Sequence, residues 1–235
     1  MARSALDLTY VLYDETSHVS HALALLTLSP ILINPAYAAL SVQTREILYV
    51  EMWAGQMLCE CFNYVLKKAI KQERPHLEMG DGYGFPSSHS QWMGYFATFL
   101  VCHFTFRHRF VTTGYRIIDS LRDILLYIFI ISWSASVAFS RYYLTYHTAE
   151  QVLWGYTIGI VFGLLYYTAV ELVPSRAPHG LLGSLKTRLL TSTIFTWFRI
   201  RDSWTIWSDG GLDPQYLRWR TTWDAAQALQ MKKSD

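Results

Sequence analysis

The chain has 235 residues, which is enough for one domain of ordinary size and too few for two. Hydrophobic residues make up 51% of the chain and charged residues 16%, below the roughly one quarter that is usual in soluble domains. A net charge of +2 is too small for a nucleic-acid-binding surface, so we expect no nucleic-acid partner. Nine Trp and sixteen Tyr suit a protein that lies partly in lipid.

Five apolar stretches are each long enough to cross a membrane, which takes roughly 20 residues. Glu51 and Glu60 interrupt the second stretch, and polar groups at such a depth usually face other helices or a water-filled pocket. The sequence therefore predicts an all-α, polytopic membrane helix bundle of about five transmembrane helices. The stretches are residues 18–40, 47–66, 91–106, 124–139 and 148–173.

The last part of the chain differs in composition. We expect residues 1–180 to form the membrane-embedded domain and residues 181–235 to form a C-terminal cytosolic or interfacial segment. Residues 184–200 are apolar but carry Lys186, Arg188 and Arg199, which is typical of a helix at the membrane surface. The rest carries four Trp residues among charges, which indicates either a surface tail anchored at the headgroup level or a small appendage folded against the helices.

The basic residues are divided unevenly between the two sides of the membrane. With five spans, the N-terminus and the connections after the second and fourth spans share one side, which holds six of the 20 basic residues. The positive-inside rule places the richer side in the cytosol. The N-terminal side is therefore expected to face a lumen or the exterior of the cell.

The first candidate site is the basic cluster at the end of the second stretch. Lys67 and Arg74 are seven residues apart, about two helical turns, so both side chains are expected on one helix face. Pro75 disfavours helix at the residue before it, which predicts Arg74 at the helix end, free to reach inward. Two such cations can hold a phosphate, although a basic cluster beside a membrane is more often a headgroup anchor.

The second candidate site is the run Pro-Ser-Ser-His at residues 86–89, which follows a glycine-rich loop. Ser88, with Gln91 three residues later, predicts a capping box that opens the third stretch as a helix. Free backbone N–H groups and the positive end of the dipole make a helix start an anion-binding site, and His89 in the first turn is expected to point at the anion. A cap of this kind is unremarkable by itself.

The third candidate site lies between the fourth and fifth stretches, in the run from Ser140 to His147. The connection is short, so Arg141 and His147 are expected at the same membrane face and close together. Histidine is a competent nucleophile whose pKa lies near neutrality. A single His at a helix start is more often a cap or an interface residue. This motif therefore indicates a catalytic site only together with the other two motifs.

The three motifs fall on one side of the five-span arrangement. Together they supply three cations, a helix start and two histidines. These are the charge clamp, the hydrogen-bond donors, the nucleophile and the acid that phosphoryl transfer needs. The other histidines show no metal-ligand spacing with carboxylates, so we expect no metal and no cofactor.

The order and spacing of these residues resemble the type 2 phosphatidic acid phosphatase superfamily, whose pattern is K-x6-RP, then PSGH, then SR-x5-H-x3-D. The resemblance implies a membrane helix bundle that hydrolyses a lipid phosphate through a phosphohistidine and without a metal. It implies His147 as the nucleophile and His89 as the acid. The residues that it assigns to the substrate phosphate are Lys67, Arg74, Ser87, Ser88 and Arg141.

Two positions depart from that pattern. Ser88 stands in place of a Gly, which keeps a backbone N–H and adds a side chain near the phosphate. Gln151 stands where the superfamily has an Asp that orients the nucleophilic histidine. A glutamine accepts a hydrogen bond from the imidazole N–H but does not stabilise an imidazolium by charge. Gln151 is the orienting candidate, and Glu150 is one residue out of register for that role.

These departures resemble the dolichyl-diphosphatase subfamily, which is also similar in length and in the runs at residues 83–91, 146–152 and 200–203. The resemblance implies hydrolysis of dolichyl diphosphate to dolichyl phosphate and inorganic phosphate at the lumenal face of the endoplasmic reticulum, recycling the lipid carrier of protein N-glycosylation. The implied partners are that lipid-linked diphosphate and the membrane lipids. The alternatives are a phosphatase for another lipid phosphate or polyprenyl diphosphate, and a non-catalytic membrane scaffold.

Overall fold

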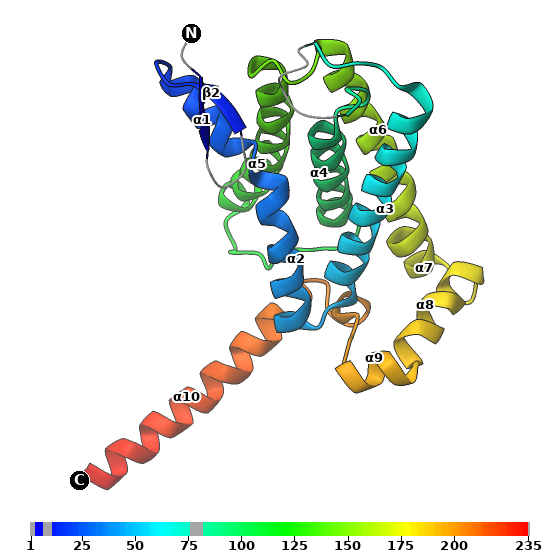
Figure 1. The fold of residues 1–235 in the computed structure, drawn as a ribbon. Coiled ribbons are helices and arrows are strands. Elements are labelled where there is room, and N and C mark those ends of the chain that lie inside the picture. Colours follow the sequence, from blue (N-terminus) through cyan, green and yellow to red (C-terminus); the bar gives the residue numbers. More distant parts are fainter. Residues whose placement is uncertain (1–2, 7–10, 76–81, 235) are drawn as a thin grey trace.

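The computed structural model describes residues 3–6, 11–75 and 82–234, and most of them are helical (Figure 1). Six helices form the main bundle. The last of them continues through a π-helical turn, Thr168–Leu172, into the short helix α7 (Val173–Arg176). The six are α1 (His18–Leu26), α2 (Ser29–Thr44), α3 (Ile47–Ile70), α4 (Ser88–Phe106), α5 (Arg116–Tyr143) and α6 (Ala149–Tyr167).

Helix α4 stands in the middle of the bundle, with α2, α3, α5 and α6 around it (Figure 1). Its side chains Met93, Tyr95 and Phe99 are fully buried and form the centre of the main hydrophobic core. Polar contacts hold the neighbouring helices to it. The Ser134 hydroxyl of α5 donates to the Met93 carbonyl at 2.7 Å, and the Tyr95 hydroxyl donates to the Met52 carbonyl of α3 at 2.9 Å.

Three helical segments of the described chain are long and apolar enough to cross a membrane: His18–Thr44, Arg116–Tyr143 and Ala149–Arg176. The second and third expected stretches form α3 and α4, with 24 and 19 residues. They are less apolar, α3 because it carries charged residues such as Glu51 and Glu60, and α4 because its first turn is polar. The prediction of an all-α membrane helix bundle is confirmed, and the count of five spans is approximate.

The first expected stretch is not one continuous helix. α1 ends at Leu26 and α2 begins at Ser29, with Pro30 in its first turn. Proline has no backbone N–H to donate and its φ angle suits the first turn of a helix, so it favours a new start here. The chain also opens with a feature that the sequence did not predict, an antiparallel hairpin of β1 (Arg3–Leu6) and β2 (Val11–Asp14).

The C-terminal part forms α8 (Leu181–Thr191), α9 (Thr193–Phe198), a 3-10 turn at Ser203–Thr205 and α10 (Leu212–Ser234). Lys186, expected at the membrane surface, is instead buried and ion-paired with Glu51 and Glu171 of the bundle. This part meets the end of the bundle away from the N-terminal hairpin, and α10 extends from there into open space (Figure 1).

Candidate active site

The Pro-Ser-Ser-His run forms the start of α4, close to the start of α6. The backbone N–H of Ser87 donates to the carbonyl of Gln151 at 3.1 Å, which joins the two helix starts. Within the described residues, the backbone N–H groups of Ser88, His89 and Ser90 have no acceptor. They are the open donors of a helix N-terminus, as an anion site requires.

The predicted capping box is wrong. Ser87, not Ser88, occupies the cap position, and its side chain makes no capping hydrogen bond to the helix backbone. The Gln91 side chain turns to α3 instead, where it donates to the Cys59 carbonyl at 2.9 Å and accepts from the Asn63 amide at 2.8 Å. Buried amides need such partners, and α3 offers them while the helix start stays open.

The third motif folds back on itself after α5. The backbone N–H groups of Tyr146 and His147 both donate to the carbonyl of Arg141, at 3.1 and 3.2 Å. Thr145 adopts the left-handed conformation, with φ at 62°, and closes the turn. Arg141 and His147 therefore lie close together, as the short connection predicted.

Arg141 is buried and its guanidinium lies over the Tyr146 ring, 3.9 Å from the ring centre. Its Nε atom has no hydrogen-bond partner in the part of the chain that the structure describes. A buried donor without an acceptor is costly for the free protein and is a common sign of a ligand site. Arg141 is therefore poised to receive an anion.

Gln151 holds the imidazole of His147. The His147 Nδ1 atom lies 3.2 Å from Gln151 Oε1, which also accepts from the Thr148 backbone N–H at 3.3 Å. The Gln151 Nε2 amide donates to the carbonyl of Glu73 at 2.9 Å. Because this network makes Oε1 the acceptor, it assigns the proton of His147 to Nδ1 and leaves the Nε2 lone pair open.

The basic cluster differs from the sequence-based expectation in one respect. Helix α3 ends at Ile70, where Lys71 takes the left-handed conformation, so Lys67 lies in the last turns but Arg74 lies beyond the helix end. Arg74 therefore approaches the site from the segment after α3, and the shared helix face was the wrong reason for pairing it with Lys67. The hydrogen bond from Gln151 to the carbonyl of Glu73 holds the neighbouring residue in place.

The cations of the first and third motifs act on the His147 imidazole. Burial lowers the pKa of His147 to about 3, and the positive charges of Arg141, Arg74 and Lys67 contribute to the same shift. The hydrogen bond from Gln151 opposes it only in part. His147 is therefore neutral at physiological pH, which is the form that attacks phosphorus. Lys67 and Ser88 are half-buried, as is His89, while Ser87 is buried.

A row of glycines on α6, not recognised in the sequence, brings α6 against α4. A Cβ atom on Gly155 would lie 2.6 Å from the Ser87 carbonyl oxygen, and one on Gly159 would lie 2.1 Å from that of Gln91. Gly163 follows four residues later. Small residues at every fourth position allow close backbone approach between membrane helices, so this spacing was the available signal.

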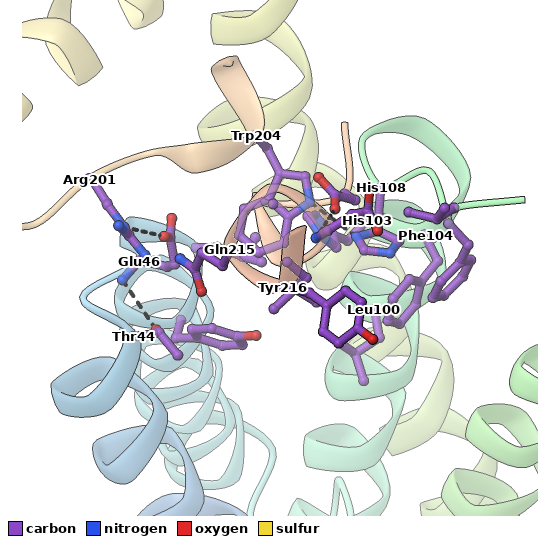
Figure 2. Close-up of a pocket in the computed structure, with 18 of the residues that line it drawn as sticks. Thr44, Glu46, Leu100, His103, Phe104, His108, Arg201, Trp204, Gln215 and Tyr216 are labelled. Atoms are coloured by element: carbon purple, nitrogen blue, oxygen red, sulfur yellow. Dashed lines mark hydrogen bonds and ion pairs between the residues drawn. The ribbon is translucent and has the colours of Figure 1, made fainter. Parts of the chain in front are cut away.

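A separate cavity of about 830 Å³ lies at the other end of α4 (Figure 2). His103, His108 and Trp204 line it, and the Trp204 indole N–H donates to His108 Nδ1 at 3.2 Å. No residue of the three motifs lines this cavity. Across the described ranges, no group of three His, Cys, Asp or Glu side chains is placed to hold a metal ion.

Comparison with known proteins identifies curated relatives of this chain. The chain is similar to the dolichyldiphosphatase of Saccharomyces cerevisiae, 34% identical over 71% of this chain and 70% of the relative. It is 37% identical to dolichyldiphosphatase 1 of Dictyostelium discoideum over 73% of this chain and 74% of the relative. The human dolichyldiphosphatase 1 is 30% identical, over 83% and 80%. No solved structure matches.

The family comparison covers the three motifs and the helices that carry them. The model of the PAP2 superfamily matches residues 48–173, which is more than half of the chain. This range runs from the second residue of α3 to the first residue of α7. The chain belongs to the PAP2 superfamily.

Proposed function

We propose that this protein hydrolyses dolichyl diphosphate to dolichyl phosphate and inorganic phosphate. The observation that carries the proposal is the neutral, buried imidazole of His147, held by Gln151 among the cations Lys67, Arg74 and Arg141. A nucleophile beside three positive charges suits a substrate with several negative charges. The names of the relatives supply the substrate, because those proteins are dolichyldiphosphatases.

In the first step of the proposed mechanism, Nε2 of His147 attacks the terminal phosphorus. The bond from phosphorus to the bridging oxygen breaks as the N–P bond forms, and His89 gives its proton to that oxygen of the departing dolichyl phosphate. Negative charge gathers on the transferred phosphoryl group. The groups proposed to neutralise it are Lys67, Arg74, Arg141, the Ser87 hydroxyl and the backbone N–H groups of Ser88 and His89.

In the second step, water attacks the phosphohistidine. His89, now neutral, takes a proton from that water, and the N–P bond to His147 breaks as inorganic phosphate forms. Gln151 keeps the imidazole in one orientation through both steps, because its Oε1 stays on the Nδ1 side of the ring. The cationic side chains supply the charge stabilisation that metal ions provide in other phosphatases.

We place the site on the lumenal side of the endoplasmic reticulum membrane, where the enzyme would return the lipid carrier of protein N-glycosylation. The distribution of basic residues supports this orientation. The starts of α4 and α6 lie at the end of the bundle that carries the N-terminal hairpin, and the C-terminal helices lie at the other end (Figure 1). That division agrees with the two sides assigned from the sequence.

The proposal is tested by phosphate release from purified, EDTA-treated protein. Dolichyl diphosphate, dolichyl monophosphate and phosphatidate are compared as substrates. We expect clear preference for the diphosphate and a fall of about a hundredfold or more in His147→Ala, since loss of such a group typically costs two to four decades in rate. His179→Ala is the matched control, because His179 is exposed and outside the motifs.

Each other outcome has a definite meaning. Equal activity on all three lipids, lost in His147→Ala, would keep the mechanism and replace dolichyl diphosphate by a wider class of lipid phosphates. Near-normal turnover in His147→Ala would contradict the nucleophile assignment. No phosphate release from any lipid would favour a membrane scaffold that retains a phosphate site.

A further inference from the structure

Glu60 places a carboxylate on the part of α3 that faces the start of α4. It is seven residues before Lys67, about two helical turns, and so lies on the same side of α3, roughly 10 Å deeper along the helix. Asn63 lies between them and donates to the Pro86 carbonyl at 3.4 Å and to Gln91 Oε1 at 2.8 Å. This side of α3 therefore faces the second motif, the Pro-Ser-Ser-His run at residues 86–89.

Glu60 and His89 line the same small cavity. Its volume is about 210 Å³, and its other walls come from Ser88 and Trp92 of α4 and from the first turns of α2. The cavity has room for several water molecules between the carboxylate and the imidazole. Neither Glu60 nor the His89 ring has a side-chain hydrogen bond or ion pair among the described residues.

A carboxylate at this depth of a membrane helix is expensive to keep. The nearby cation on the same side of the helix, Lys67, lies two turns away. Three other carboxylates on the bundle helices are either ion-paired or exposed. Glu51 of α3 and Glu171 pair with Lys186 at the far end of the bundle, and Glu150 is exposed at the start of α6. Glu60 is also exposed, but it lines a cavity shared with His89 and has no ion pair among the described residues.

His89, the proposed acid, must carry a proton, and a nearby carboxylate such as Glu60 favours its protonated state. To give a proton to the leaving oxygen, His89 must first be an imidazolium, yet the charged groups that act on it are Arg141, Lys67, Arg74 and the second imidazole, His147. All of these oppose a further positive charge. The superfamily pattern has a carboxylate at position 151, but Gln151 is neutral. Among the residues that the structure describes, Glu60 is the only carboxylate that lines the cavity next to His89.

We propose that Glu60 is the positioning residue of the acid: its ionised carboxylate accepts a hydrogen bond from the His89 imidazolium, through water in the shared cavity, and keeps His89 protonated. This inference rests on the proposed function. In the first step the proton on the other ring nitrogen of His89 goes to the bridging oxygen, and in the second step a proton from the attacking water restores it. Glu60 stays ionised throughout.

The test uses the full-length protein with Glu60→Gln, and kcat and KM for dolichyl diphosphate are measured across pH. We expect kcat to fall about tenfold or more with little change in KM, since Glu60 does not touch the substrate. The basic limb of the kcat profile should move to lower pH by about one unit or more, because an opposite charge nearby favours the imidazolium by that amount. Glu60→Asp, which keeps the charge, should leave the limb close to its wild-type place.

Two controls separate this role from a structural one. Glu150→Gln removes an exposed carboxylate near the site and should change neither kcat nor the limb. In a His89→Ala background, Glu60→Gln should cause no further loss, since a residue that acts through His89 has nothing left to act on. Equal losses in both backgrounds, or an unmoved basic limb, would overturn the proposal. A wild-type protein without phosphate release would instead overturn the proposed function.

Discussion

The side-chain amide of Gln151 both accepts and donates hydrogen bonds. Its oxygen accepts from His147 and from the Thr148 backbone, and its nitrogen donates to the Glu73 carbonyl, next to Arg74. The amide thus orients the nucleophile and also fixes the segment that carries one of the phosphate-binding cations. An aspartate could do only the first of these, because a carboxylate has no N–H to donate.

Replacing Gln151 by Glu should change how the nucleophile responds to pH. His147 attacks in its neutral form, and its pKa is about 3 in the wild type, so the acid limb of the kcat/KM profile should lie near that pH. A carboxylate at position 151 stabilises the imidazolium and raises the pKa of His147 by about 1–3 units. Activity in Gln151→Glu should therefore fall off at higher pH than in the wild type.

The measurement is the kcat/KM profile of both proteins on the same substrate, so that ionisation of the substrate cancels in the comparison. Gln151→Asn is the matched control, because it shortens the side chain without adding charge. It should lower kcat/KM without moving the acid limb to higher pH, because the hydrogen bond that it weakens favours the imidazolium. An acid limb that does not move in Gln151→Glu would contradict the contact between this residue and His147.

Single residues show where sequence reasoning worked and where it stopped. The contact between His147 and Gln151 was expected from the resemblance to the superfamily, whose pattern has the orienting residue at position 151, and the structure places the two side chains within hydrogen-bonding distance. The predicted capping box was wrong because the Gln91 side chain forms its hydrogen bonds with Cys59 and Asn63 of α3, which are distant in the sequence. The hydrogen bond from Gln151 to Glu73 joins residues 78 apart, and no local pattern encodes it.

At the scale of whole helices, the contact between α4 and α6 sets the distance between the second and third motifs. Both helices start at the site, and the glycines of α6 let the backbones touch near Ser87 and Gln91. The core helices themselves were predictable, since each is a long apolar run. The ends of these helices were harder to predict. Lys71 takes the left-handed conformation, and α3 therefore ends at Ile70, four residues before Arg74.

Adding one methyl group to this contact should separate the motifs. A Cβ on Gly159 would lie 2.1 Å from the Gln91 carbonyl oxygen, and backbone has no room to yield, so Gly159→Ala should destabilise the fold by about 1–3 kcal/mol and lower phosphate release. At Gly163 the added Cβ would lie 3.1 Å from its nearest neighbours. Gly163→Ala should therefore be milder in both respects.

The unfolding temperature in detergent and the rate of phosphate release check this order. Measuring both at one temperature below the transitions separates lost stability from a displaced site. If Gly159→Ala matched Gly163→Ala in both quantities, the close approach of α4 and α6 would not be what holds the second motif against the third.

At the scale of the whole molecule, a buried ion cluster ties the C-terminal part to the bundle. Lys186 Nζ lies 3.1 Å from Glu51 Oε2 and also pairs with Glu171. Arg107 Nε lies 3.1 Å from Glu171 Oε2, and its Nη2 lies 3.2 Å from Asp202 Oδ1. Segments far apart in the sequence meet here, so neither the burial of Lys186 nor its partners could be predicted from the surrounding residues.

Removing the cation from this cluster should loosen the C-terminal part without changing the chemistry. Lys186→Met leaves Glu51 without its cation and Glu171 with Arg107 alone, and breaking a buried ion pair typically costs about 3–5 kcal/mol. The unfolding temperature should fall clearly, while phosphate release measured well below it should persist, since the cluster lies at the opposite end from the motifs. Arg188→Met, on the exposed side of the same helix, should have little effect on either quantity. Equal unfolding temperatures for the two variants would contradict a stabilising role.

The two-sided amide of Gln151 also limits how the family can diverge. A lineage that exchanges Gln for Asp at this position gains a charge on the nucleophile and loses the link to the segment before Arg74 in one substitution. The carboxylate would also stand near the Glu73 carbonyl, where like partial charges repel. An exchange of Gln for Asp at this position should therefore require a second change in the segment after α3 to hold Arg74 in place.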